Sequence, residues 1–185
     1  MTISLTKKQI DAALPKIEEG LKQYLWLQSK AKASCIFHED EEFQRKYNHF
    51  YKVRRASAWR NTFYNLMAQS KKEHLQFHEV IEALRLATGR YEVSFASKLV
   101  ATLDTSMPII DSVVLKNLNM RLPSATAPDR AAKICKLHKK LATCFADFLQ
   151  TENGKHLVSQ FNVKYPSAKI TEIKMLDLVL WQTRT

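Results

Sequence analysis

The sequence predicts an all-α fold, and three observations lead to this fold class. Glycine is scarce, with three residues in 185, and proline is confined to five positions. No stretch alternates apolar and polar residues for long, as a half-buried strand would. Apolar residues instead recur at helical spacing, most clearly at Ile134, Leu137, Leu141, Phe145 and Phe148. We therefore expect about eight helices.

The first elements are predicted from capping and breaking residues. Thr6 and Gln9 have the spacing of a capping box, which opens a first helix. Pro15 interrupts this stretch and leaves a longer helix over about 16–30. A connection is expected over 31–37.

The middle of the chain is predicted to hold four helices. One runs from Asp40 to about residue 52, and Ser57 is expected to cap the next. A third covers about 73–87 and ends at Gly89, which has the position of a C′ glycine. A fourth is expected over 93–103.

The last third begins with a helix over 111–119. A long amphipathic helix follows from Asp129, and a short one is expected over 152–161. Thr171 precedes a final helix that is apolar nearly all round, so we expect it to be buried on more than one side.

Length and composition fit one helical domain over residues 1–185. No apolar run approaches the roughly 20 residues that span a bilayer, and the N-terminus does not have the pattern of a secretory signal. The three cysteines, Cys35, Cys135 and Cys144, have no CxxC spacing and are interpreted as reduced thiols, with the last two as core residues. We expect a cytoplasmic protein without contact to a membrane.

The net charge of +11 is concentrated in two blocks. Residues 43–72 contain eight Lys or Arg and no acid, and residues 112–140 contain seven against the single Asp129. Two basic blocks in an otherwise nearly neutral chain favour a surface that faces a polyanion, and nucleic acid is the first candidate. A solubilising basic surface is the alternative.

Residues 77–119 form a hairpin-like element with a known order of parts. A helix ends near Ala87, the turn 88–92 contains one glycine, and a second helix precedes Pro108 and the run Ile110-Asp111-Ser112-Val113-Val114. This order resembles the helix-hairpin-helix DNA glycosylase superfamily, and the run 174–181 looks like the closing helix of some relatives. The resemblance implies a helix-hairpin-helix glycosylase-like helical domain.

The same resemblance implies roles for particular residues. Asp111 would stabilise the positive charge that develops on the sugar as the base leaves, and backbone N–H groups near Gly89, with Arg90, would hold a DNA phosphate. Val93 and Ser94 stand where family members that also cut the strand carry a Schiff-base lysine. The implied reaction is therefore hydrolysis of an N-glycosidic bond without lysine chemistry.

Asp111 also has a purely structural interpretation. Aspartate is among the best N-cap residues, and capping contributes roughly 1 kcal/mol. The two interpretations are compatible because a capping carboxylate stays ionised and oriented. Lys98 lies one helical turn beyond Ser94, and its neighbours indicate that it points elsewhere.

Two basic segments are candidates for the nucleic-acid surface. Arg54 and Arg55 belong to a run in which cations alternate with aromatic residues, a mixture that suits phosphates and an unstacked base. Lys133, Lys136 and Lys140 form a stripe on the long helix, about 100° from its apolar face. Both sets could equally be solvated rims, with Trp59 and Phe63 as core residues.

Metal and nucleotide sites are not expected. His74 and His78 share a helix face, but the HExxH order and a third ligand are missing. The sequence contains no P-loop and no GxGxxG, so no cofactor is predicted.

The functional expectation is a DNA-binding repair protein of the monofunctional DNA glycosylase type. It would act as a hydrolase on duplex DNA that carries a damaged base, with protein partners left open. Two alternatives remain: a nucleic-acid-binding module without chemistry, and a helical protein-interaction domain whose basic surface meets an acidic partner.

Overall fold

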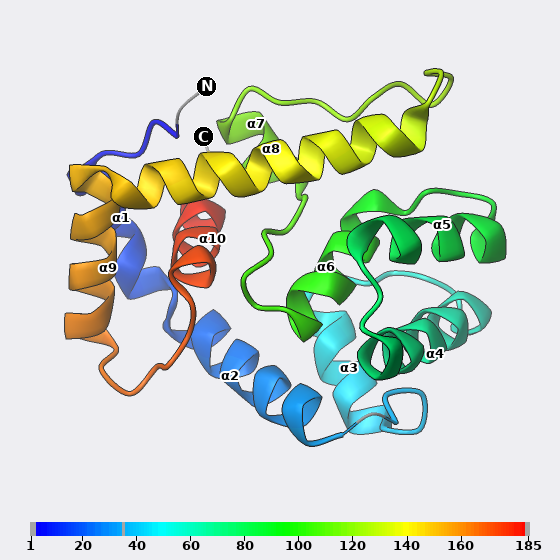
Figure 1. The fold of residues 1–185 in the computed structure, drawn as a ribbon. Coiled ribbons are helices and arrows are strands. Elements are labelled where there is room, and N and C mark those ends of the chain that lie inside the picture. The colour runs from blue at the N-terminus through cyan, green and yellow to red at the C-terminus, as the bar shows by residue number, and fades with distance from the viewer. Residues whose placement is uncertain (1–2, 35, 184–185) are drawn as a thin grey trace. The chain divides into compact units, whose positions relative to one another are not determined.

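Every regular element in the computed structural model is helical across the part that it describes, residues 3–34 and 36–183 (Figure 1). The all-α prediction is confirmed for this part. It holds ten α-helices and one 3-10 turn rather than about eight helices. They are α1 (Lys7–Ala13), η1 (Leu14–Lys16), α2 (Glu18–Ala33), α3 (Glu41–Phe50), α4 (Ser57–Glu73), α5 (Phe77–Thr88), α6 (Val93–Leu103), α7 (Ser112–Asn117), α8 (Arg130–Gln150), α9 (Glu152–Lys164) and α10 (Glu172–Gln182).

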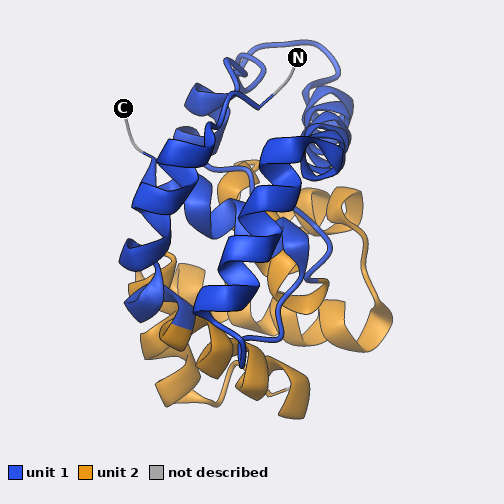
Figure 2. Ribbon diagram, turned by 90° about the vertical axis from the view of Figure 1, so that its left-hand side faces the viewer, with its two compact units in different colours: residues 1–21, 105–185 blue, residues 22–104 orange. Residues whose placement is uncertain are grey.

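The chain divides into two compact units (Figure 2). Unit 1 combines residues 1–21 with residues 105–185 and holds α1, α7, α8, α9 and α10. Unit 2 consists of residues 22–104 and holds α3, α4, α5 and α6, while α2 begins in unit 1 and continues into unit 2. The expectation of one domain over 1–185 stays a prediction.

The first helix begins as predicted, whereas α2 runs from Glu18 to Ala33 rather than over about 16–30 and includes the start of the expected connection. The Oγ1 atom of Thr6 accepts a hydrogen bond from the N–H of Gln9 at 3.3 Å, and the Gln9 side chain accepts one from the N–H of Thr6 at 2.9 Å. This capping box opens α1. Pro15 lies in the 3-10 turn that separates α1 from α2, because its ring excludes a regular helix there.

Two predicted boundaries in unit 2 were wrong. Ser57 is the first residue of α4 and not its cap, which is Ala56 and provides no side-chain hydrogen bond. The helix expected to start at 73 starts at Phe77, since α4 itself runs to Glu73. His74 ends α4 in the left-handed conformation at φ 57°. Glycine is the usual residue at such a helix end, so the sequence did not indicate that the helix ends here.

Aromatic side chains form the centre of unit 2. Phe43, Tyr47, Phe63 and Tyr64 are fully or almost fully buried, with ring centroids 5.3 to 5.9 Å apart for four of their pairs. Burial raises the pKa of both tyrosines. Phe63 is a core residue as predicted, while Trp59 is half-buried and stacks on it at 5.2 Å.

The core of unit 1 lies between α8, α9 and α10. The predicted apolar stripe of α8 is buried at Ile134, Leu141, Phe145 and Phe148. The run 174–180 of α10 is buried at every position, which confirms the expectation that this helix is covered on more than one side. Cys144 is buried and Cys135 half-buried, whereas Cys35 lies outside the described residues.

Gly154 allows α9 to begin directly against the end of α8. A Cβ atom there would clash with the carbonyl oxygen of Phe148 and lie 2.6 Å from the Cα atom of Leu149. The glycine is buried, and its N–H donates to the Oγ1 atom of Thr151, the N-cap of α9, at 3.1 Å. The corner between the two helices therefore requires a residue without a side chain.

Candidate nucleic-acid interface

Asp111 is the N-cap of α7. Its carboxylate accepts a hydrogen bond from the N–H of Val113 at 2.8 Å, and its carbonyl oxygen accepts one from Leu115. Ile109 and Ile110 before it are buried, and Asp111 itself is only 9% exposed. The capping role is therefore present, and little of the carboxylate surface is left for a ligand.

The segment that leads to Asp111 is held by a buried histidine of α8. The Nε2 atom of His138 lies 2.9 Å from the carbonyl oxygen of Pro108, which can only accept, so this nitrogen carries the proton. His138 is 5% exposed, and burial lowers its pKa because the charged ring is poorly solvated. This histidine was not among the predicted site residues.

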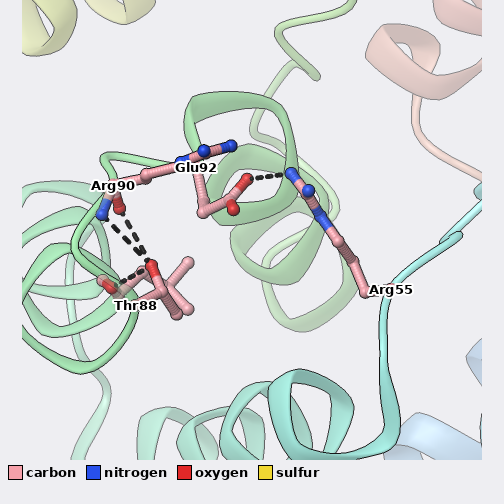
Figure 3. Close-up of polar contacts among 5 residues, drawn as sticks. Arg55, Thr88, Arg90 and Glu92 are labelled. Atoms are coloured by element: carbon pink, nitrogen blue, oxygen red, sulfur yellow. Dashed lines mark hydrogen bonds and ion pairs between the residues drawn. The ribbon is translucent and has the colours of Figure 1, made fainter.

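The turn between α5 and α6 carries Gly89 and Arg90, and Figure 3 shows Arg90 next to Thr88. Gly89 is left-handed at φ 73°, as predicted for a C′ glycine, and its N–H donates to the carbonyl oxygen of Arg85 at 2.9 Å. The N–H of Arg90 donates to the Oγ1 atom of Thr88 at 3.4 Å. Both N–H groups thus have acceptors in α5, and the exposed guanidinium of Arg90 remains for an anion.

Arg54 and Arg55 have different surroundings. The Nη2 atom of Arg55 lies 2.8 Å from the Oε2 atom of Glu92, whose side chain is 8% exposed (Figure 3). The Arg55 guanidinium also lies over the rings of Trp59 and Phe95, at 5.6 and 5.4 Å from their centroids. Arg55 therefore fastens the segment before α4 to the start of α6, whereas Arg54 is exposed.

Other cations of the basic block 43–72 also have structural partners. The Nζ atom of Lys71 donates to the carbonyl oxygens of Ala31, Lys32 and Ser34 at 2.6 to 3.0 Å, and so closes the end of α2. Lys46 pairs with Glu42 at 3.0 Å. Three of the eight cations of this block, Lys46, Arg55 and Lys71, therefore have partners within unit 2.

The long helix α8 presents a dense group of exposed cations. Lys133, Lys136 and Lys140 are all exposed, as is Lys139, which the sequence analysis did not include. None of the four has an ion-pair partner within the described part of the chain. We call these four residues the lysine face of α8.

The lysine face and Asp111 are not brought together within unit 1. His138 contacts the segment of Asp111, and the helical repeat places Lys136 about 160° away from it around α8. The lysines therefore point away from the carboxylate. Gly89, Arg90, Arg54 and Arg55 belong to unit 2, so the predicted site residues are divided between the two units.

Two lysines are buried and have partners inside the protein. Lys98 of α6 donates to the carbonyl oxygen of Tyr51 at 3.3 Å and lies under the ring of Phe95. Lys174 of α10 pairs with Asp177 at 2.6 Å. The Oδ1 atom of Asp177 is buried without a hydrogen-bond partner in the described residues.

Residues 3–34 and 36–183 show neither a cluster of metal-binding side chains nor a membrane-spanning helix. No group of three or more His, Cys, Asp or Glu there could hold a metal ion, and His74 and His78 are both exposed. None of the helices in those ranges combines the length and apolar character that crossing a membrane requires. Comparison with protein-family models, curated proteins and solved structures finds no match.

Proposed function

We propose that this protein binds nucleic acid through the lysine face of α8. The observation that carries the proposal is the presence of four exposed lysines on adjacent turns, none of which forms an ion pair with another residue that the structure describes. Phosphate groups attract such an array, and the release of their counterions supplies free energy for binding.

The position of these lysines is unfavourable for the helix itself. Of the four, only Lys133 lies close enough to the positive N-terminal end of α8 for the helix dipole to disfavour it. Lys136 has like-charged neighbours three residues before it and three and four residues after it, and each such pair destabilises a helix. A polyanion that binds there offsets both effects.

The geometry supports binding without an assigned reaction. Asp111 caps α7, has little exposed surface and lies away from the lysine face. Base excision at Asp111, which the resemblance to DNA glycosylases implies, stays a prediction with its own test.

A salt titration tests the proposal. Affinity for random-sequence duplex DNA should fall steeply between about 50 and 200 mM salt. The variant K133Q/K136Q/K139Q/K140Q should lose most of this affinity. The control K7Q/K16Q/K155Q/K169Q removes the same charge from other exposed positions of unit 1 and should bind almost as the parent does.

Equal losses in the two variants would mean that only net charge matters, and α8 would have no special role. Absence of binding at low salt would reject the proposal and favour an acidic protein as the partner of this surface.

A further inference from the structure

The lysine face of α8 extends in two dimensions. From Lys133 to Lys140 it covers about 10 Å along the helix axis, at a rise of about 1.5 Å per residue. Around the axis, the four residues fall within an arc of about 120°, since successive residues are turned by about 100°. A single row of phosphates lies opposite only part of such a surface, whereas two rows can meet all of it.

The other exposed residues of α8 do not suit the recognition of bases. They are Ala132, Thr143, Ala146, Asp147 and Gln150. Proteins that hold single strands stack bases on aromatic rings, and this face has none. Base edges are read in pairs of hydrogen bonds by arginine, lysine, asparagine or glutamine, and Gln150 lies at the far end of the helix from the lysines. Lysine lacks the planar fork of arginine and binds phosphate as a point charge, so we assign these lysines to phosphates.

Small residues also lie beside the lysines. Ala132 and Thr143 are exposed on the same side of α8 and do not hold the backbone away from a partner. An α-helix is about 10–12 Å in diameter, and the major groove of B-form DNA is about 12 Å wide. The helix and the groove therefore match in size.

We infer that α8 lies along a groove of a double helix, with its lysines on phosphates of both strands and no contact to base edges. The inference rests on the proposed function and names its substrate class. It follows that affinity depends on the duplex form and not on base sequence or on the presence of a lesion. Four phosphate contacts correspond to a slope of about −3.6 in log affinity against log salt concentration.

The test compares a duplex of random sequence with a thymidine homopolymer strand of equal phosphate number, each titrated with the full-length protein over a range of salt concentrations. We expect the duplex to bind at least about tenfold more tightly, since the strand offers one phosphate row and no stacking partner. In K133Q/K136Q/K139Q/K140Q the slope for the duplex should fall by about 3 to 4, and in the charge-matched control it should remain.

Equal affinity and slope for strand and duplex would overturn the inference and leave nucleic-acid binding intact. A preference of more than about tenfold for one duplex sequence would also overturn it, since bases would then contribute. Equally tight, lysine-dependent binding to phosphatidylserine vesicles would show that any dense anionic surface suffices and would reject a double helix as the specific occupant. No binding to either nucleic acid would reject the proposed function as well.

Discussion

The Nε2 atom of His138 donates a hydrogen bond to the carbonyl oxygen of Pro108 from a position that is 95% buried. This contact joins α8 to the segment in front of α7. Both nitrogens of a protonated ring can still donate, but burial disfavours the charged form, and the stability of unit 1 should therefore depend on pH.

The folded-state pKa of His138 is lowered, mainly by burial, from an unfolded value of about 6.5. Between these two values the unfolded chain binds the proton first, so the free energy of unfolding falls as the pH drops below about 6.5. Below the folded pKa this contribution is lost and no longer changes. Urea unfolding at about pH 7.5 and about pH 5.5 should show the decrease, with a smaller one in His138→Gln, which retains a donor for Pro108. An identical pH dependence in the variant would contradict this assignment.

Replacing Lys136 by glutamine should stabilise the protein while it weakens DNA binding. Three like-charged neighbours at helical spacing are relieved, for a gain of about 0.5 to 1 kcal/mol in the free energy of unfolding. Lys155→Gln is the matched control, since Glu152 lies three residues before Lys155 and no gain is expected there. Chemical denaturation measures both, and a destabilised Lys136→Gln would mean that the lysine has an internal partner.

Gly154→Ala should destabilise unit 1 by about 2 to 3 kcal/mol, because its Cβ atom meets the backbone of Phe148 and Leu149. Gly20→Ala provides the comparison. Gly20 lies inside α2 with no atom near an added Cβ. Alanine there should raise the free energy of unfolding by up to about 1 kcal/mol. Thermal or urea unfolding of the two variants should move in opposite directions. Equal stability of Gly154→Ala and the parent would rule out the close corner between α8 and α9.

The pair Arg55–Glu92 should contribute more than the pair Arg85–Glu82. Glu92 has an 8% exposed side chain, whereas Arg85 and Glu82 are both about 40% exposed on one helix. A double-mutant cycle with glutamine at both positions should give a coupling energy above about 1 kcal/mol for the first pair and about 0.3 kcal/mol for the second. Similar coupling energies would mean that the burial of Glu92 adds nothing.

Asp111 offers a test that separates capping from catalysis. Asp111→Ala should lower the free energy of unfolding by about 1 kcal/mol, whereas Asp111→Asn retains a side-chain acceptor and should cost less. If base excision occurs at this residue, Asp111→Asn should remove it and leave DNA affinity unchanged. Excision from lesion-bearing oligonucleotides measures this directly, and parent-like excision by Asp111→Asn would eliminate the catalytic role.

Local signals in the sequence identified most of the helices. The capping box of Thr6, the C′ glycine Gly89 and the cap Asp111 each depend on residues a few positions apart, and all three have the predicted conformation. The end of α4 was not predicted because His74, and not a glycine, adopts the left-handed conformation there.

The candidate site was less predictable because its contacts join distant parts of the chain. His138 meets Pro108 across 30 positions and Arg55 meets Glu92 across 37. No spacing rule indicates such pairs. The sequence identified Arg55 as a cation but could not show that it pairs with the carboxylate of Glu92. Such a cation differs from the lysines of α8 in its solvent exposure, which only the structure gives.

The division of the chain has a consequence for synthesis. Unit 2 is contained in residues 22–104, and all of its residues are available before most of unit 1 has been translated. The first 21 residues must wait for the C-terminal helices before their own core can close. During translation α1 therefore emerges before unit 2 and yet gains its neighbours only after unit 2 is complete, so removal of α1 should impair unit 1 selectively.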